Sequence, residues 1–432
     1  MTTNTTRQML ILLCLFAGSP YAGADWPRLR GPDGSGISPD TNVPVTWTES
    51  SNLKWKTPLP GPGSSSPIIG GQHVFVTCYS GYGLSRTNPG NMAELKRHLL
   101  CIDRDSGKQR WSRTIEAAMP EDRFAGLGLP EHGYASNTPV TDGERVYVFF
   151  GKTGVLAFDL DGNQLWQVNV GRESSNRRWG SSASLTLYKD MVIVNASDES
   201  QSIRALNKAT GKEVWRAEAE LLELAYGTPT LIENDDGAAE LVIGVPEELW
   251  SLHPDTGKLK WYAQTNLTGN VCPAVVAGDG TVYLFGGYRS SGSYALRIGG
   301  KGDVTDSHML WSSRNSSYVA TPLLHDGHLY WVDDRGQAFC VSARTGESVY
   351  RERLDGVTSG GRPFYASPVL AGGKIYVVSR RDGTFVFAAK PEFEKMAQNQ
   401  FPSDKTDFNA TPAISKSELF LRSNESLYCI AE

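Results

Sequence analysis

Short apolar segments alternate with glycine-rich turns along almost the whole chain, and they predict β-strands. Arg145–Phe149 and residues 374–378 are five-residue runs in which apolar side chains alternate or dominate. Such runs are typical of half-buried or fully buried strands. A turn of the type Thr-Gly-Lys often follows and leads to a tryptophan, most clearly over residues 205–215. Its glycine supplies the positive φ that a tight hairpin requires.

These strands and turns belong to a unit that recurs about every 45 residues, a period typical of β-propeller blades. A small or polar residue followed by proline opens most units, and the next strand begins seven positions later. The marker positions are Pro67, Pro139, Leu185, Pro229, Pro273, Pro322, Pro368 and Pro412. Only the first interval is longer, by roughly 27 residues, which indicates an insertion there. Eight markers predict eight blades.

The last unit ends at Glu432 without the strand that carries the turn tryptophan. Residues 52–56 form an unpartnered strand of the missing type. We therefore predict an all-β fold, an eight-bladed β-propeller closed by an N-terminal strand, over residues 52–432, because closure removes unpaired sheet edges. Residues 25–51 are expected to form an N-terminal extended segment. The seventh unit has no aromatic side chain at the position of the turn tryptophan, and its residues 390–397 predict a short helix or an irregular excursion.

The tryptophan after each turn offers a large flat surface that can pack between neighbouring blades. The sixth unit has Tyr350 at this position. The predicted docking residues are Trp55, Trp111, Trp166, Trp215, Trp261 and Trp311.

The N-terminal residues indicate in which compartment the protein resides. Residues 1–24 combine Arg7, an apolar stretch over residues 9–17 and a small-residue site at 22–24, the pattern of a secretory signal peptide. The apolar stretch is too short for a membrane-spanning helix. We expect an exported protein, periplasmic or extracellular, with no integral membrane segment. The net charge of −5 argues against nucleic acid as a partner.

Five cysteines follow the predicted signal peptide, at positions Cys78, Cys101, Cys272, Cys340 and Cys429. Their odd number and wide spacing argue against a disulfide-built scaffold. The His325–His328 pair falls in a repeat turn and lacks further ligands nearby, so we expect no metal site.

Eight units with Gly-Lys-x-x-Trp turns resemble the pyrroloquinoline-quinone-like (PQQ-like), or tryptophan-docking, propeller repeats, over about residues 52–432. The resemblance implies one of two functional branches. Quinoprotein dehydrogenases bind the quinone and a calcium ion on the propeller axis, and many carry adjacent cysteines that this chain lacks. The non-enzymatic branch, similar to the outer-membrane assembly factor BamB, binds protein partners. The opening residues 25–36 also resemble the start of secreted repeat proteins of planctomycete-type bacteria.

Aromatic and arginine residues precede many of the marker positions. Because the first strand of each blade lines the central channel of a propeller, we expect these side chains to form an axial collar at one mouth. Rings and guanidinium groups there can hold a planar or anionic small molecule or a peptide. The alternative is that the rings only plug the channel. The collar candidates are Tyr134, Arg178, Trp179, Tyr226, Tyr318, Arg362, Tyr365 and Phe408.

The first unit contains two long excursions, over residues 79–98 and 117–133. Long loops on a rigid scaffold often carry function, although a solvated surface loop is the simpler interpretation. The candidates in the second excursion are Glu121, Arg123, Glu131 and His132.

These observations favour an exported binding or scaffold propeller that engages envelope proteins or peptides, without catalysis of its own and without a cofactor. A small-molecule ligand fits the same collar. One alternative is an oxidoreductase similar to the PQQ-dependent alcohol and sugar dehydrogenases, with PQQ and calcium. Another is a carbohydrate-binding propeller.

Overall fold

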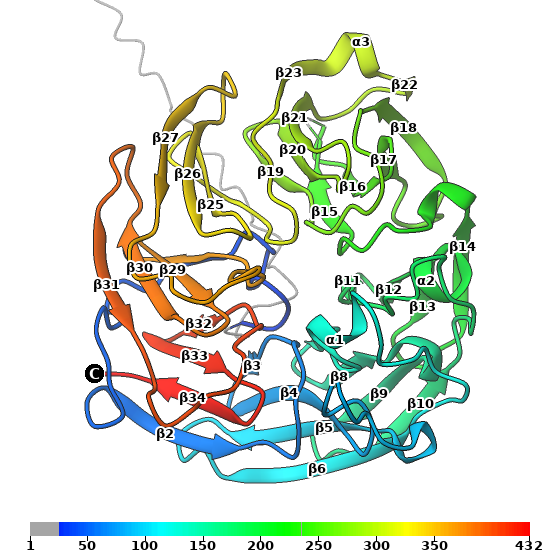
Figure 1. Ribbon diagram of the computed structural model, residues 1–432. Coiled ribbons are helices and arrows are strands. Elements are labelled where there is room, and N and C mark those ends of the chain that lie inside the picture. Colours follow the sequence, from blue (N-terminus) through cyan, green and yellow to red (C-terminus); the bar gives the residue numbers. More distant parts are fainter. Residues whose placement is uncertain (1–25, 235) are drawn as a thin grey trace, which may run out of the picture.

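Eight four-stranded or five-stranded sheets surround a central axis in the computed structural model, which describes residues 26–234 and 236–432 (Figure 1). This is the eight-bladed β-propeller that the repeat predicts. The predicted signal peptide, residues 1–24, lies outside the described residues.

The four strands of each blade follow one another from the axis outward. Blade 1 contains β3 (Ile68–Gly70), β4 (His73–Ser80), β5 (Lys96–Asp103) and β6 (Gln109–Glu116). Blade 2 contains β7 (Val140–Thr141), β8 (Arg145–Phe149), β9 (Val155–Asp159) and β10 (Gln164–Val168). Blade 3 contains β11 (Thr186–Tyr188), β12 (Met191–Ala196), β13 (Ser202–Asn207) and β14 (Glu213–Glu218). Blade 4 contains β15 (Thr230–Glu233), β16 (Ala239–Val245), β17 (Glu248–Leu252) and β18 (Leu259–Gln264), with β22 (Gly302–Asp303) added.

The second half of the ring repeats this order. Blade 5 contains β19 (Val276–Gly278), β20 (Thr281–Gly286), β21 (Gly292–Arg297) and β23 (Met309–Ser313). Blade 6 contains β24 (Leu323–His325), β25 (His328–Val332), β26 (Gln337–Ser342) and β27 (Ser348–Arg353). Blade 7 contains β28 (Val369–Ala371), β29 (Lys374–Ser379), β30 (Gly383–Ala388) and β31 (Lys395–Asn399), with β1 (Ile37–Ser38) beside β28. Blade 8 contains β32 (Ala413–Ser415), β33 (Glu418–Arg422), β34 (Ser426–Ile430) and β2 (Leu53–Pro58).

Among the described residues, helical structure is confined to single turns between strands. These are α1 (Leu129–His132), α2 (Ser197–Ser200), α3 (Thr305–His308), η1 (Met92–Glu94), η2 (Gly151–Thr153) and η3 (Glu220–Leu222). Within the part of the chain that the structure describes, no helix has the length and apolar character needed to cross a bilayer.

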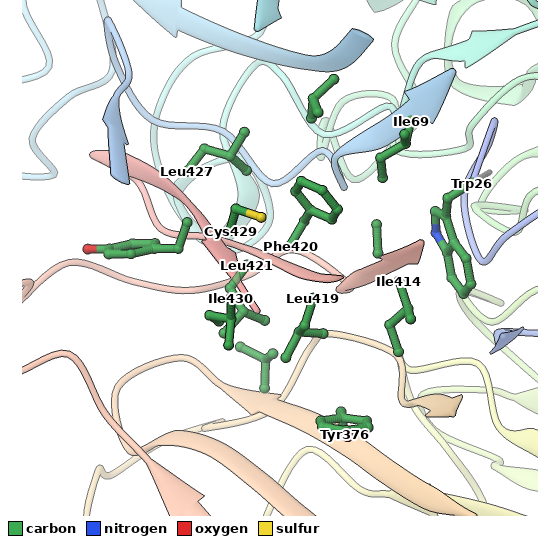
Figure 2. Close-up of a cluster of buried hydrophobic side chains, with 14 of the residues drawn as sticks. Trp26, Ile69, Tyr376, Ile414, Leu419, Phe420, Leu421, Leu427, Cys429 and Ile430 are labelled. Carbon is green, nitrogen blue, oxygen red and sulfur yellow. The ribbon is translucent and has the colours of Figure 1, made fainter. Parts of the chain in front are cut away.

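The ring closes through the N-terminal strand, as predicted. β2 pairs antiparallel with β34, so that Leu53 lies opposite Ile430 and Pro58 opposite Ser426. The blue N-terminal strand and the red C-terminal strands therefore share one blade in Figure 1. Side chains of blade 8 pack with Trp26, Ile69 and Tyr376 in one buried cluster (Figure 2).

Tryptophan docking joins successive blades. The Trp215 indole N–H donates to the Pro254 carbonyl of the next blade at 2.9 Å, and its ring lies against Gly257. Gly257 has φ of +70°, and a Cβ there would clash with the ring, so both the turn and the contact require glycine. Equivalent bonds run from Trp55 to Arg104, from Trp111 to Leu160, from Trp166 to Lys208 and from Trp311 to Ala343.

Trp261 departs from this pattern. It is fully buried and packs in a cluster with side chains of blade 5, but its N–H donates at 2.7 Å to Glu240 of its own sheet. Blade 5 has an excursion with β22 and α3 where blades 1 to 4 and blade 6 have the short glycine turn, and β22 pairs parallel with β18. The expected acceptor in the next turn is therefore replaced by a carboxylate within the blade.

Two details of the predicted repeat are wrong. The irregular stretch that we expected over residues 390–397 ends at Glu394, because Lys395–Asn399 forms the outer strand β31, and Ala397 occupies the docking position opposite Val386. In blade 5 the marker position is Val275, because β19 begins at Val276 and β20 at Thr281. Pro273 lies two residues before this position.

The N-terminal extended segment crosses the propeller axis. Trp26 and Ile69 of blade 1 exchange backbone hydrogen bonds, and the Pro27 carbonyl accepts from Thr141 of blade 2. Buried Arg30 then donates to the carbonyls of Thr321, Pro322 and Pro368, on blades 6 and 7. One short segment thus connects opposite sides of the ring.

Removal of a docking ring should destabilise the propeller. Trp215→Ala is expected to cost about 3–5 kcal/mol, because the 8% exposed indole fills the space between blades 3 and 4. Denaturant unfolding followed by circular dichroism measures this loss. The neighbouring Val214→Ala is the matched control: Val214 is 51% exposed, so its change should stay within about 0.5 kcal/mol. Equal effects of the two substitutions would contradict the docking role.

Candidate functional site

A cavity of about 570 Å³ lies on the propeller axis. Its wall includes one residue just before the inner strand of every blade. These wall residues are Ser66, Thr138, Ser184, Thr228, Ala274, Thr321, Ser367 and Thr411. Leu29 also lines the cavity, so the segment that crosses the axis forms its floor.

The hydroxyl groups of this wall are linked around the axis, and we call them the hydroxyl ring. The backbone N–H of Thr138 donates to the Ser184 hydroxyl at 3.0 Å, and that of Thr321 donates to the Ser367 hydroxyl at 2.9 Å. Each of these two hydroxyls accepts a backbone hydrogen and keeps its own O–H as a donor. The remaining bonds run from Ser66 to Thr138, Ser184 to Thr228, Ala274 to Thr321 and Ser367 to Thr411.

Aromatic rings and arginines lie at the other end of the cavity. Trp179 and Tyr226 stack with centroids 5.9 Å apart and an interplanar angle of 22°. The Arg362 guanidinium lies 4.4 Å from the centroid of the Tyr318 ring. All four of these side chains line the cavity, and so does Tyr365. The rings therefore line the cavity and do not fill it.

Helix α1 brings Glu131 and His132 to this mouth. The two carboxylate oxygens of Glu131 lie 2.5 Å from Arg86 and 2.7 Å from Arg380 of blade 7. Arg380 also forms an ion pair with Asp407 at 2.6 Å and lies 5.1 Å from the Tyr365 ring. The excursion of the first blade thus reaches across the axis and is held there by charge.

The protonation states at this mouth follow from its contacts. Burial acts to raise the pKa of Glu131, but hydrogen bonds and positive charge from Arg86 and Arg380 outweigh it, so the net pKa lies below the ordinary 4.5. Burial lowers the pKa of His132. Its Nε2 lies 2.9 Å from the Trp179 carbonyl and its Nδ1 lies beside the Ser136 hydroxyl, which suits a neutral imidazole.

The Cys272 thiol at the cavity wall is not activated as a nucleophile. Burial raises the pKa of the Cys272 thiol, which lines the cavity, to about 11, so this thiol is protonated at neutral pH. The structure describes Cys78, Cys101, Cys272, Cys340 and Cys429 as free thiols.

The other predicted site residues lie away from the cavity wall. Tyr134 packs with Tyr79 and Phe124 behind α1, and its hydroxyl donates to the Asp122 carbonyl. Phe408 stacks with Phe401 and Tyr428 in the core around blade 8. The collar prediction therefore included two rings that support the wall from behind.

The charged candidates Glu121, Arg123 and Arg178 also lie away from the cavity wall. Glu121 forms a buried ion pair with Arg97 at 2.7 Å, so it stabilises the loop. Arg123 and Arg178 are exposed and do not line the cavity. Sequence reasoning missed Arg86, Arg380 and the hydroxyl ring. The small polar residue before most of the markers was a signal for the ring, whereas the arginines follow no repeat.

The carboxylates that line the cavity do not suit a calcium ion. Calcium takes six to eight oxygen ligands. Glu131 and Asp407 are both neutralised by arginines. Among residues 26–234 and 236–432, no group of three or more His, Cys, Asp or Glu side chains is placed to hold a metal. The residues therefore do not fit the quinone–calcium centre that the dehydrogenase branch implies.

Comparison with known families identifies the repeat. A family model described as "Outer membrane protein assembly factor BamB" matches residues 91–220 and 303–391, just over half of the chain. The chain belongs to this BamB-like family of PQQ-like-repeat propellers. No curated protein sequence matches it.

Solved structures share the fold of this BamB-like chain. BamB from Moraxella catarrhalis is 14% identical, with a TM-score of 0.59 over 88% of this chain and 99% of that one. Quinohemoprotein alcohol dehydrogenase from Comamonas testosteroni is 12% identical, with a TM-score of 0.63 over 95% and 81%. The computationally designed Ika8 protein is 11% identical, with a TM-score of 0.55 over 87% and 99%. Identities this low show a common propeller fold alone.

The ion pairs of Glu131 predict a defined pH dependence. Because its folded-state pKa is lowered, the contribution of the ionised carboxylate to stability is complete above about pH 4.5 and is lost as the pH falls through the folded pKa. At pH 7, Glu131→Gln should lower the free energy of unfolding by about 1–3 kcal/mol. The difference from wild type should shrink toward pH 3 in denaturant titrations. A difference that does not depend on pH would show that packing, not charge, is responsible.

Proposed function

We propose that this protein is an exported binding or scaffold propeller of the cell envelope, and that its axial cavity engages a polypeptide segment of a partner protein. The observation that carries the proposal is that the cavity contains groups suited to binding, whereas its two carboxylates are neutralised. Rings, hydroxyls and guanidinium groups line one cavity, while Glu131 and Asp407 are already held by arginines. A carboxylate that arginines hold ionised is a weak general base.

The shape of the cavity supports a segment that enters from the collar mouth. A volume of about 570 Å³ lies within the range of ligand sites. Strands and interblade hydrogen bonds hold its wall, so little order must be gained on binding. The floor formed by Leu29 limits how far a segment can enter. Membership in the BamB-like family and the predicted signal peptide support an envelope location.

Two other functions share parts of this geometry. The fold shared with a quinohemoprotein alcohol dehydrogenase and the aromatic axial cavity favour a quinone-dependent oxidoreductase as the second candidate. A carbohydrate-binding propeller has less support, because Trp179, Tyr226, Tyr318 and Tyr365 line the cavity and do not form a row outside it.

Thermal unfolding distinguishes the binding module from the oxidoreductase. We expect no shift of the melting temperature with pyrroloquinoline quinone plus calcium well above micromolar concentrations, because the carboxylates at the collar are paired with arginines. A ligand that binds the folded state specifically raises the melting temperature in a saturable way. Such a rise would favour the oxidoreductase, and assays on alcohols and sugars would follow.

Site-directed photocrosslinking in the native envelope tests the binding role directly. A benzophenone amino acid at Tyr288, which lines the mouth and is 43% exposed, should form an adduct with a partner polypeptide. The matched control is the same group at Val349, 41% exposed on the outer strand β27. Adducts at Val349 alone, or equally at both sites, would contradict engagement through the cavity.

A further inference from the structure

We infer that the collar recognises a carboxylate on the partner segment, and that Glu131 of α1 is an internal occupant which this carboxylate displaces. The inference rests on the proposed function and adds the chemistry of the segment. An acidic side chain and a chain terminus both supply such a carboxylate.

The charge of the cavity favours an anion. Four arginines line it. The carboxylates Glu131 and Asp407 also line it, and Asp334 pairs with Arg362 at 3.3 Å, so positive charge is in excess by one. The four arginines are Arg86, Arg362, Arg380 and Arg381. The hydroxyl ring adds O–H donors below them. Arginine also binds carboxylates through several N–H donors at once, which gives geometric specificity.

Glu131 occupies the position that such an anion would take. One of its oxygens lies 2.5 Å from Nη2 of Arg86 and the other 2.7 Å from Nη1 of Arg380. The side chain of Arg86 is 52% exposed, whereas that of Arg380 is 15% exposed and lies over the Tyr365 ring. An entering carboxylate can therefore reach Arg86 first and then compete for Arg380.

Two unsatisfied polar atoms beside Glu131 favour a polypeptide as the source of the anion. Arg380 Nε is a buried donor and Asn409 Oδ1 a buried acceptor, and neither has a hydrogen-bond partner among the described residues. Asn409 Nδ2 contacts the Glu131 carbonyl, so both atoms lie at the same site. Buried polar groups are normally paired. A peptide supplies an amide N–H for Asn409 together with a carboxylate for Arg380, whereas a simple anion supplies only an acceptor.

The excursion allows Glu131 to leave without unfolding. α1 is a single turn between Gly128 and Gly133, which have φ of +104° and +74°. Leu129 and Tyr134 on either side stay anchored in the cluster behind it, and His132 stays bonded to the Trp179 carbonyl. A side-chain rotation of Glu131 is therefore enough to free both guanidinium groups.

Three acetylated eight-residue peptides of glycine, serine and one phenylalanine test the inference. The first ends in a free carboxylate, the second in an amide, and the third in an amide with one internal glutamate. Titration of the full mature protein by calorimetry should detect binding of the first or third peptide, and of the second at least about tenfold more weakly. This ratio corresponds to about 1.4 kcal/mol. Binding of only the first assigns the chain terminus, and binding of only the third assigns an acidic side chain.

Substitutions at the collar test the displacement. Glu131→Gln should increase affinity for the carboxylate peptides by about tenfold or more, because Arg86 and Arg380 lose their internal anion. Arg380→Gln should abolish this preference for carboxylates. Arg86→Gln should weaken the preference, and its exposed position makes it the variant to use if Arg380→Gln unfolds the protein. Glu116→Gln removes a 72% exposed carboxylate that pairs with Lys96 outside the cavity, so it should change nothing.

Each contrary outcome has a distinct meaning. Equal binding of all three peptides would overturn the carboxylate inference and leave the binding function in place. Carboxylate binding that Glu131→Gln does not strengthen would overturn the displacement. No binding of any peptide to any variant, together with no photocrosslink at Tyr288, would overturn both the inference and the proposed function.

Discussion

Pairing of β2 with β34 is the constraint on which the rest of the structure depends. This pair places Trp55 on the turn of blade 1, where its N–H donates to the Arg104 carbonyl and Thr57 donates to the Gly107 carbonyl. Buried Arg422 of blade 8 adds bonds to Ser65 of blade 1. Every blade packs one sheet face against each neighbour, so an open ring would expose the facing surfaces of blades 1 and 8.

Closure also creates the site. Glu131 lies in the excursion between blades 1 and 2, and Arg380 lies in the short turn between β29 and β30 of blade 7, yet the ring brings them into contact. The hydroxyl ring has the same origin, because each backbone N–H finds its acceptor in the next blade only when the inner strands stand side by side. The side chains of the candidate site are thus arranged by the same interblade geometry that stabilises the fold.

The N-terminal segment closes one end of the cavity. Arg30 holds the segment against blades 6 and 7, while Trp26 and Pro27 hold it against blades 1 and 2. With Leu29 as the floor, the collar is the mouth through which a ligand can enter. The long excursion of the first blade places α1 at that mouth. Insertions of this kind can change without loss of the ring, which is how one propeller scaffold serves different ligands.

The sequence by itself determined the eight blades, the closing strand and the docking tryptophans, because each depends on signals within a few residues that recur along the chain. It failed where a signal was shifted or absent: Pro273 lies two residues before its structural position, and Ala397 replaces the docking aromatic on a regular strand. Only the tertiary structure decided which collar residues face the cavity. Trp179 lines it and Tyr134 does not, since the direction of a loop side chain depends on the neighbouring blade. The Glu131–Arg380 ion pair likewise has no local pattern, because it forms between chain segments that meet only after the ring has closed.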